Sequence, residues 1–131
     1  VAATVANDGV RMEPRLGRLF RDEYGRTTLN VTPERATRVM KRETAAELNK
    51  MMRKVVEEGT GGAANVGNLR MAGKTGTAEV RGGNQAWFIG FAPAEAPVVA
   101  VAVVIEDTSS TGGEVAAPVA AAVMRAAIEA R

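Results

Sequence analysis

Three strand-like segments follow one another in the second half of the chain and constrain its fold more than any other feature. The first, Met71–Val80, is closed by a glycine-rich break at residues 81–84. The apolar run Ala86–Ala92 then returns alongside it, and Val98–Glu106 follows as a third strand. This third segment is apolar on both faces, which predicts a central strand that is covered on both sides. We therefore expect an antiparallel meander with helices packed on its faces, a fold of the α+β class.

Two helices are predicted around these strands. Thr44 and Glu47 have the spacing of a capping box, so we expect a helix with Thr44 as its N-cap that runs to about Glu58. Apolar residues recur along it at helical spacing and form one stripe, which comprises Leu48, Met51, Met52, Val55 and Val56. A second helix is expected from Glu114 to the end of the chain, with Pro118 in its first turn. It is apolar almost all round, which predicts burial against the sheet.

The first third of the chain predicts a helix end and an exposed hairpin. Residues 1–6 have the character of the last turns of a helix, which Gly9 terminates. A helix without a beginning suggests a fragment of a longer protein. Arg15–Phe20 and Arg26–Val31 predict two short strands, with Gly25 at positive φ in the turn between them. We expect their alternating arginines on a solvated face; a phosphate-binding patch is less favoured, since no interleaved aromatic residues accompany them.

The composition excludes several classes of catalytic and binding site. The chain contains neither cysteine nor histidine, so it lacks thiolate ligands as well as the commonest general base and metal ligand. A net charge of +2 is too small to predict a polyanionic partner. The apolar run Val115–Ala130 is interrupted by Pro118, Arg125 and Glu129, so it is too short and too charged to span a bilayer. We expect no metal site, no cofactor and no nucleic-acid partner.

The last lysine of the sequence, Lys74, lies among small residues and two hydroxyl side chains, and the pattern predicts it at a buried strand edge. Thr75 and Thr77 are two residues apart on a strand, so they point to the same face, and Gly76 between them allows close approach of a ligand. This set suits an anionic acyl substrate, whereas the alternative is a solvated lysine at a strand end. A phosphate-binding P-loop is rejected, because its first glycine would fall at Asn68 and no helix follows Thr75.

Three segments at this spacing resemble the C-terminal part of a known family. They are Gly73–Glu79, Ala86–Pro93 and Val98–Glu106, and they are similar to the transpeptidase domain of penicillin-binding proteins. The resemblance is strongest to the class B, monofunctional type. Within that type, the chain resembles the actinobacterial proteins that act in septal or cell-wall growth. The similarity extends upstream to Val55–Gly61 and Val1–Gly9 and downstream to Gly112–Gly113 and Ala116–Pro118, and so covers nearly the whole chain.

The resemblance implies a penicillin-binding and serine-β-lactamase-like fold whose sheet has five strands. This chain would supply three of them and the C-terminal helix, so residues 1–131 are expected to form the C-terminal part of a single transpeptidase domain. Of the three family boxes, only the Lys-Thr-Gly box is present. The only serines are Ser109 and Ser110, and no lysine follows Lys74, so a Ser-x-x-Lys box is impossible here. The nucleophile is therefore expected on a preceding segment.

Roles for individual residues follow from the resemblance. Lys74 would act electrostatically and in proton relay, and the hydroxyls of Thr75 and Thr77 would bind the terminal carboxylate of the substrate or of a β-lactam. The backbone N–H of Thr77 would be one of two oxyanion donors. The strand edge that follows could pair with the substrate backbone. We thus expect Lys74 and Thr77 as catalytic residues, and as substrate-binding residues Thr75, Gly76, Thr77 and Ala78.

The resemblance also implies an activity and partners. The complete domain would be a serine-type D-Ala-D-Ala transpeptidase that cross-links peptidoglycan, and this chain alone would be inactive. Expected partners are the D-Ala-D-Ala stem peptide, β-lactams, the missing N-terminal segment, and divisome or elongation proteins. The expected location is the extracytoplasmic face of the bacterial membrane, with an anchor outside this chain. The alternatives are a non-catalytic penicillin-binding or sensor module and a domain related to serine β-lactamases.

Overall fold

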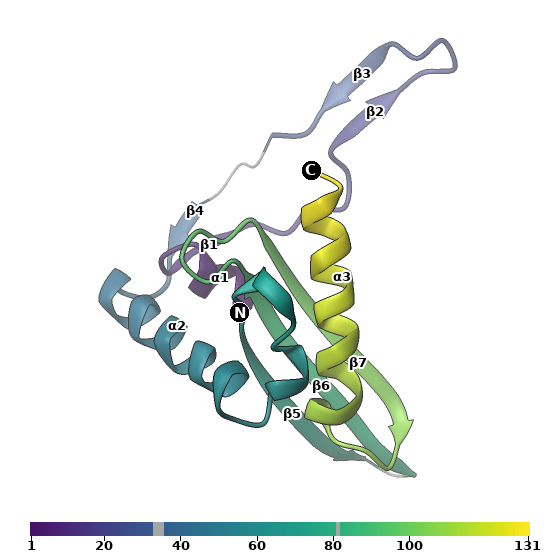
Figure 1. Ribbon diagram of the computed structural model, residues 1–131. Coiled ribbons are helices and arrows are strands. Elements are labelled where there is room, and N and C mark those ends of the chain that lie inside the picture. Colours follow the sequence, from purple (N-terminus) through teal and green to yellow (C-terminus); the bar gives the residue numbers. More distant parts are fainter. Residues whose placement is uncertain (33–35, 81) are drawn as a thin grey trace.

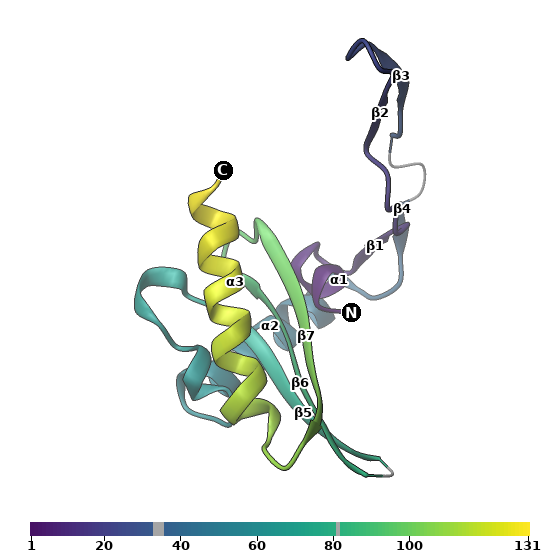
Figure 2. The same cartoon turned by 90° about the vertical axis from the view of Figure 1, so that its right-hand side faces the viewer.

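A computed structural model describes residues 1–32, 36–80 and 82–131 (Figure 1). A three-stranded sheet forms the centre of the body, with a long helix across one face and a short N-terminal helix against the other (Figure 2). A thin ribbon of short strands projects away from this body. The predicted α+β class is therefore confirmed. A turn that the sequence predicts at residues 32–36 falls mostly on the first gap, outside the described residues.

The sheet is an antiparallel meander, as predicted. Its strands are β5 (Ala72–Val80), β6 (Gly83–Ala92) and β7 (Val99–Thr108), in the order β5-β6-β7. Strand β6 begins earlier than expected, so the break between β5 and β6 is shorter than the predicted one; Arg81 within it lies outside the described residues. In the register, Thr75 lies opposite Phe88 and Gly76 lies opposite Trp87.

Strand β7 is not the central, doubly covered strand that its composition predicts. In the described part of the chain it is an edge strand, because only β6 pairs with it. One face of β7 packs on the main core, the larger cluster of buried residues, which includes Phe88 and Met124. The β7 residues that pack there are Val99, Val101, Val103 and Ile105. The alternate residues Ala100, Ala102 and Val104 are exposed. Strand β7 is therefore apolar on both faces although only one of them is buried.

Helix α3 (Ala117–Glu129) covers the face of the sheet that carries Phe88. Its buried residues are Ala117, Ala120, Ala121 and Met124, and Pro118 lies in its first turn, as predicted. The predicted burial against the sheet is therefore confirmed, although Val119 and Val123 on the outer face of the helix are exposed. A π-helical turn, η3 (Gly112–Ala116), precedes it. Among the described residues, no helix has the length and apolarity needed to cross a bilayer.

Helix α2 (Arg42–Glu57) packs beside β5. It begins before the predicted start, with Lys41 rather than Thr44 at the N-cap, so the predicted capping box at Thr44 and Glu47 is wrong. The apolar stripe is confirmed except at Met51, which is 60% exposed. Two contacts tie α2 to the connection between β6 and β7. The Asn49 side-chain amide donates to the Ala94 carbonyl at 2.7 Å, and Arg53 pairs with Glu95 at 3.0 Å.

The N-terminal helix α1 (Ala2–Ala6) covers part of the second sheet face. Ala2 and Val5 pack there in a smaller core with Phe91 and Met52. Gly9 follows the helix at φ +83°, a backbone conformation that suits glycine and ends the helix as predicted. Two short 3₁₀ turns connect α2 to β5, and they are η1 (Gly62–Ala64) and η2 (Gly67–Leu69).

The projecting ribbon, called the arm below, contains four short strands. They pair antiparallel as β1 (Val10–Met12) with β4 (Ala36–Arg38) and as β2 (Leu19–Arg21) with β3 (Thr27–Asn30). The hairpin between β2 and β3 turns at Gly25, whose φ is +78°, as predicted. The pairing of β1 with β4 was not predicted, because residues far apart in the sequence form it. Every residue of β2 and β3 is exposed, as expected for a solvated ribbon.

Candidate active site

The predicted site residues Lys74 to Ala78 lie on β5, which is the other edge strand of the described sheet. Side chains alternate between the two faces of a strand, so Lys74 and Gly76 share one face while Thr75 and Thr77 share the other. Lys74 lies opposite Ile89 in the register, on the face away from α3. From Thr77 onward the strand is exposed, and Ala78 lies on this exposed stretch. The residues are therefore gathered at one sheet edge but divided between two faces.

The two threonine hydroxyls point to the same face, as the sequence predicts, and each has a partner there. The Oγ1 atoms of Thr75 and Thr60 are 2.6 Å apart, a hydrogen-bond distance that lets either hydroxyl donate. The Thr77 hydroxyl oxygen accepts a bond from the backbone N–H of Gly112 at 3.4 Å. These partners come from the loop after α2 and from the start of η3. Two separate segments therefore contact the face of β5 that carries Thr75 and Thr77.

Lys74 differs from the threonines in its surroundings. Its side chain is exposed, whereas the sequence pattern suggests a lysine at a buried edge. The Nζ atom donates to the backbone carbonyl of Thr75 at 2.6 Å. None of the ion pairs among the described residues involves Lys74. The ammonium therefore keeps its charge uncompensated at the open edge of the sheet.

Two glycines bring the start of η3 into direct contact with the sheet and with the loop that carries Thr60. A Cβ atom on Gly112 would overlap the carbonyl oxygen of Trp87 and lie 2.5 Å from that of Gly76. A Cβ atom on Gly113 would overlap the carbonyl oxygen of Thr60. All three obstacles are backbone atoms, so a side chain at either position would push the segments apart. This close approach allows the Gly112 N–H to reach Thr77.

A capping box fixes the turn that carries these glycines. The backbone N–H of Thr111 donates to the Glu114 carboxylate at 2.8 Å, and the Thr111 hydroxyl donates to it at 3.0 Å. The Thr111 side chain accepts from the Glu114 backbone in return. The backbone bond and then the side-chain bond from Thr111 hold the pKa of Glu114 below its usual value, against slight desolvation. Sequence reasoning missed this box, although the Thr-x-x-Glu spacing was available to find it.

The loop that carries Thr60 is held by the end of α2. The Gly61 N–H donates to the Val55 carbonyl at 2.9 Å, and a Cβ atom on Gly61 would lie 3.4 Å from the Phe88 ring. Gly61 is buried, whereas the neighbouring Thr60 side chain is exposed to solvent and bonded to Thr75. Sequence reasoning also missed Thr60. No local pattern pairs it with Thr75, because the contact depends on how the chain turns after α2.

The two serines do not complete a nucleophilic site in the described structure. Ser109 and Ser110 follow β7, where the Ser110 N–H donates to the Thr108 hydroxyl at 3.1 Å. Within the described residues, no hydrogen bond joins either serine to Lys74. The same residues hold no group of three acidic side chains that could bind a metal ion. What the site offers is a cation, two oriented hydroxyls and an open strand edge.

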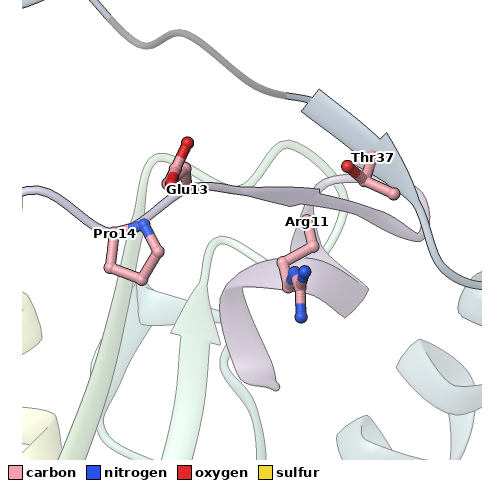
Figure 3. Close-up of a pocket in the computed structure, with 4 residues that line it drawn as sticks. All are labelled: Arg11, Glu13, Pro14 and Thr37. Carbon is pink, nitrogen blue, oxygen red and sulfur yellow. The ribbon is translucent and has the colours of Figure 1, made fainter.

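A separate hollow lies at the base of the arm (Figure 3). Its volume is about 320 Å³, and it is lined by Arg11, Glu13, Pro14 and Thr37. None of the residues from Lys74 to Ala78 borders it. It is open, and its lining includes one cation and one carboxylate that point in different directions, so it lacks the groups for acyl-transfer chemistry. The candidate site therefore lies on β5.

Comparison with known proteins places these features in a family context. The family model described as "Penicillin binding protein transpeptidase domain" matches residues 1–125. Peptidoglycan D,D-transpeptidase PbpA of Mycolicibacterium smegmatis is 40% identical over 138 aligned residues, which cover 98% of this chain and 28% of that protein. The chain thus spans less than a third of the length of this curated relative.

Two solved structures share the fold. The D,D-transpeptidase domain of a peptidoglycan glycosyltransferase from Eggerthella lenta superposes with a TM-score of 0.87 at 38% identity, over 98% of this chain and 30% of that one. Penicillin-binding protein A from Mycobacterium tuberculosis, solved as an imipenem acyl-enzyme complex, superposes with a TM-score of 0.85 at 34% identity. That match covers 97% of this chain and 29% of the other.

Proposed function

Because this chain belongs to the penicillin-binding-protein transpeptidase domain family, we propose that it forms one wall of a peptidoglycan D,D-transpeptidase active site. In this proposal, residues 1–131 are the C-terminal part of a single domain, and the reacting serine lies on another segment. The observation that carries the proposal is the open edge of β5, which holds the uncompensated Lys74 ammonium on one face and two hydroxyls with fixed partners on the other.

The wall is suited to bind an anionic peptide end. The hydroxyls of Thr75 and Thr77 donate to the terminal carboxylate of a D-Ala-D-Ala stem peptide or to the carboxylate of a β-lactam. Hydrogen bonds to a charged acceptor are roughly twice as strong as neutral ones. Gly76 lets the ligand approach the backbone, and the exposed edge at Ala78 pairs with the substrate backbone. Support comes from the unpaired edge of β5 in the described sheet.

The chemistry is acyl transfer. A serine Oγ from the other segment attacks the carbonyl carbon of the penultimate D-alanine, an ester bond forms, and the peptide bond to the terminal D-alanine breaks. The departing amine takes up a proton, and the amine of a second stem peptide then attacks the ester, which releases the serine and forms the cross-link. Lys74 supplies positive charge and relays protons. The backbone N–H of Thr77 serves as one of two oxyanion donors.

The proposal includes a location and further partners. Cross-linking of stem peptides takes place outside the bacterial membrane, so the domain acts at the extracytoplasmic face, anchored by a segment outside this chain. The described helices include none that could cross a bilayer. The segment that carries the serine is an obligatory partner of this wall, and divisome or elongation proteins are further partners. β-Lactams bind as substrate analogues.

Labelling with a fluorescent penicillin tests the proposal. The complete domain that contains this chain is expected to be labelled, whereas residues 1–131 alone are not, because they lack the nucleophile. Lys74→Ala should lower the rate of labelling on the order of 10²-fold or more, as expected for loss of a proton-relay group. Lys54→Ala is the matched control, since Lys54 is another exposed lysine but lies on α2.

Several results would contradict the proposal. Covalent labelling of the isolated chain would show that the nucleophile does not lie elsewhere. Equal labelling of the Lys74→Ala and Lys54→Ala variants would remove Lys74 from the site. Release of D-alanine from a stem-peptide analogue distinguishes a transpeptidase from a penicillin-binding sensor, which would be labelled without releasing it.

A further inference from the structure

Thr60 is the only described side chain that makes a hydrogen bond to the hydroxyl of Thr75. It belongs to the loop between α2 and η1 rather than to the sheet. The backbone around it is fixed on two sides. The Gly61 N–H is bonded to the end of α2 at Val55, and the Thr60 carbonyl lies against Gly113. Thr60 is therefore presented to β5 from a rigid support, although its own side chain is exposed.

The direction of the hydroxyl pair follows from hydrogen-bond chemistry. A hydroxyl has one proton to donate, and a carboxylate can only accept. When Thr75 donates its proton to a bound carboxylate, it has none left for Thr60, so the bond between the two threonines must run from the Thr60 O–H to the Thr75 Oγ1. This produces a directed chain from Thr60 through Thr75 to the ligand. Consecutive bonds of this kind polarise and strengthen one another.

We infer that Thr60 is a positioning residue, whose hydroxyl orients the Thr75 O–H toward the carboxylate of the substrate or of a β-lactam. The inference rests on the proposed function of Thr75 and extends it to a residue outside the lysine box. Without this partner, the Thr75 side chain can turn among its staggered rotamers and lose the aligned geometry. The role predicts weaker binding of the carboxylate, with a smaller effect on the later bond-breaking step.

The test uses the complete domain that contains this chain and the kinetics of acylation by a fluorescent penicillin. Thr60→Val removes the hydroxyl and keeps the shape, and it is expected to raise the apparent dissociation constant about fivefold, as for loss of one net hydrogen bond. The limiting acylation rate should change less. Thr60→Ser restores the hydroxyl and should return the constant to near the wild-type value. Thr28→Val, on the exposed strand β3, is the control threonine and should change neither quantity.

A double-variant cycle separates positioning from a general structural effect. If Thr60 acts through Thr75, then Thr60→Val has no further effect on binding in a Thr75→Val background. Additive losses would overturn the inference, as would unchanged binding by Thr60→Val or failure of Thr60→Ser to restore it. Thr60→Ala replaces Thr60→Val if the latter does not fold, which a melting curve reveals. Absence of labelling in the wild-type domain would instead overturn the proposed function, and the role of Thr60 with it.

Discussion

At the scale of single residues, the geometry of the Lys-Thr-Gly box depends on hydrogen bonds from other segments as much as on its own side chains. The common face of Thr75 and Thr77 could be predicted from strand alternation alone, and each hydroxyl does find its partner on that face. Their partners Thr60 and Gly112 could not, because those contacts join segments that are distant in the sequence. The exposure of Lys74 was also not predictable, since it depends on what covers the sheet rather than on the local pattern.

Gly112 offers a sharp test at this scale. Gly112→Ala would place a Cβ atom into the backbone of β5 and β6, so we expect the start of η3 to move away from Thr77. Overpacking of this kind costs about 1–3 kcal/mol. Thermal melting of the complete domain should show the loss of stability, and the labelling rate with fluorescent penicillin should fall with it. Gly62→Ala is the matched control, because a Cβ atom there meets no atom within 4 Å. Equal melting temperatures for both variants would contradict the described contact.

At the scale of elements, the types and order of the main helices and strands were predictable, while their limits and surroundings were less so. The capping-box spacing occurs twice, at Thr44 and at Thr111, and only the second forms in the structure. The first falls inside α2, because the helix already begins at Arg42. The edge position of β7 was not predictable, since its composition does not reveal how many strands pair with it.

The rotation of α2 about its axis can be tested with two neighbouring methionines. Met52 is 8% exposed and packs in the smaller core, whereas Met51 is 60% exposed. Met52→Ala should lower the free energy of unfolding by about 2–5 kcal/mol through loss of buried contacts. Met51→Ala should change it by no more than about 0.5 kcal/mol. Urea denaturation of the complete domain measures both values. The reverse order would show that the helix presents its other side to the sheet.

At the scale of the whole molecule, the two faces of the sheet differ in their cover. Helix α3 and η3 close one face, while α1 covers only part of the other. The second face therefore leaves Trp87, Ala102 and Val104 exposed among the described residues. Exposed contiguous apolar surface of this kind favours association with another surface. The open backbone edges of β5 and β7 add to this tendency.

We expect the isolated chain of residues 1–131 to associate with itself rather than to remain a monomer. Val104→Lys, at a position that is 38% exposed on the partly covered face, should shift the population toward monomer. Val119→Lys is the control, because it places the same charge on the outer face of α3. Light scattering coupled to size exclusion measures the mass. A monodisperse wild-type monomer that melts cooperatively would contradict the expectation.

The arm is also the covalent connection between α1 and α2. Within this chain, α1 and α2 touch each other in the body, yet the polypeptide between them runs out through the arm and back. Every residue of β2 and β3 is exposed, so this hairpin is a preferred place for a protease to cut. One such nick would leave the body folded but would separate α1 covalently from α2. The two pieces would then stay together only through the packing of α1, where Val5 is the anchor, and would part on a denaturing gel.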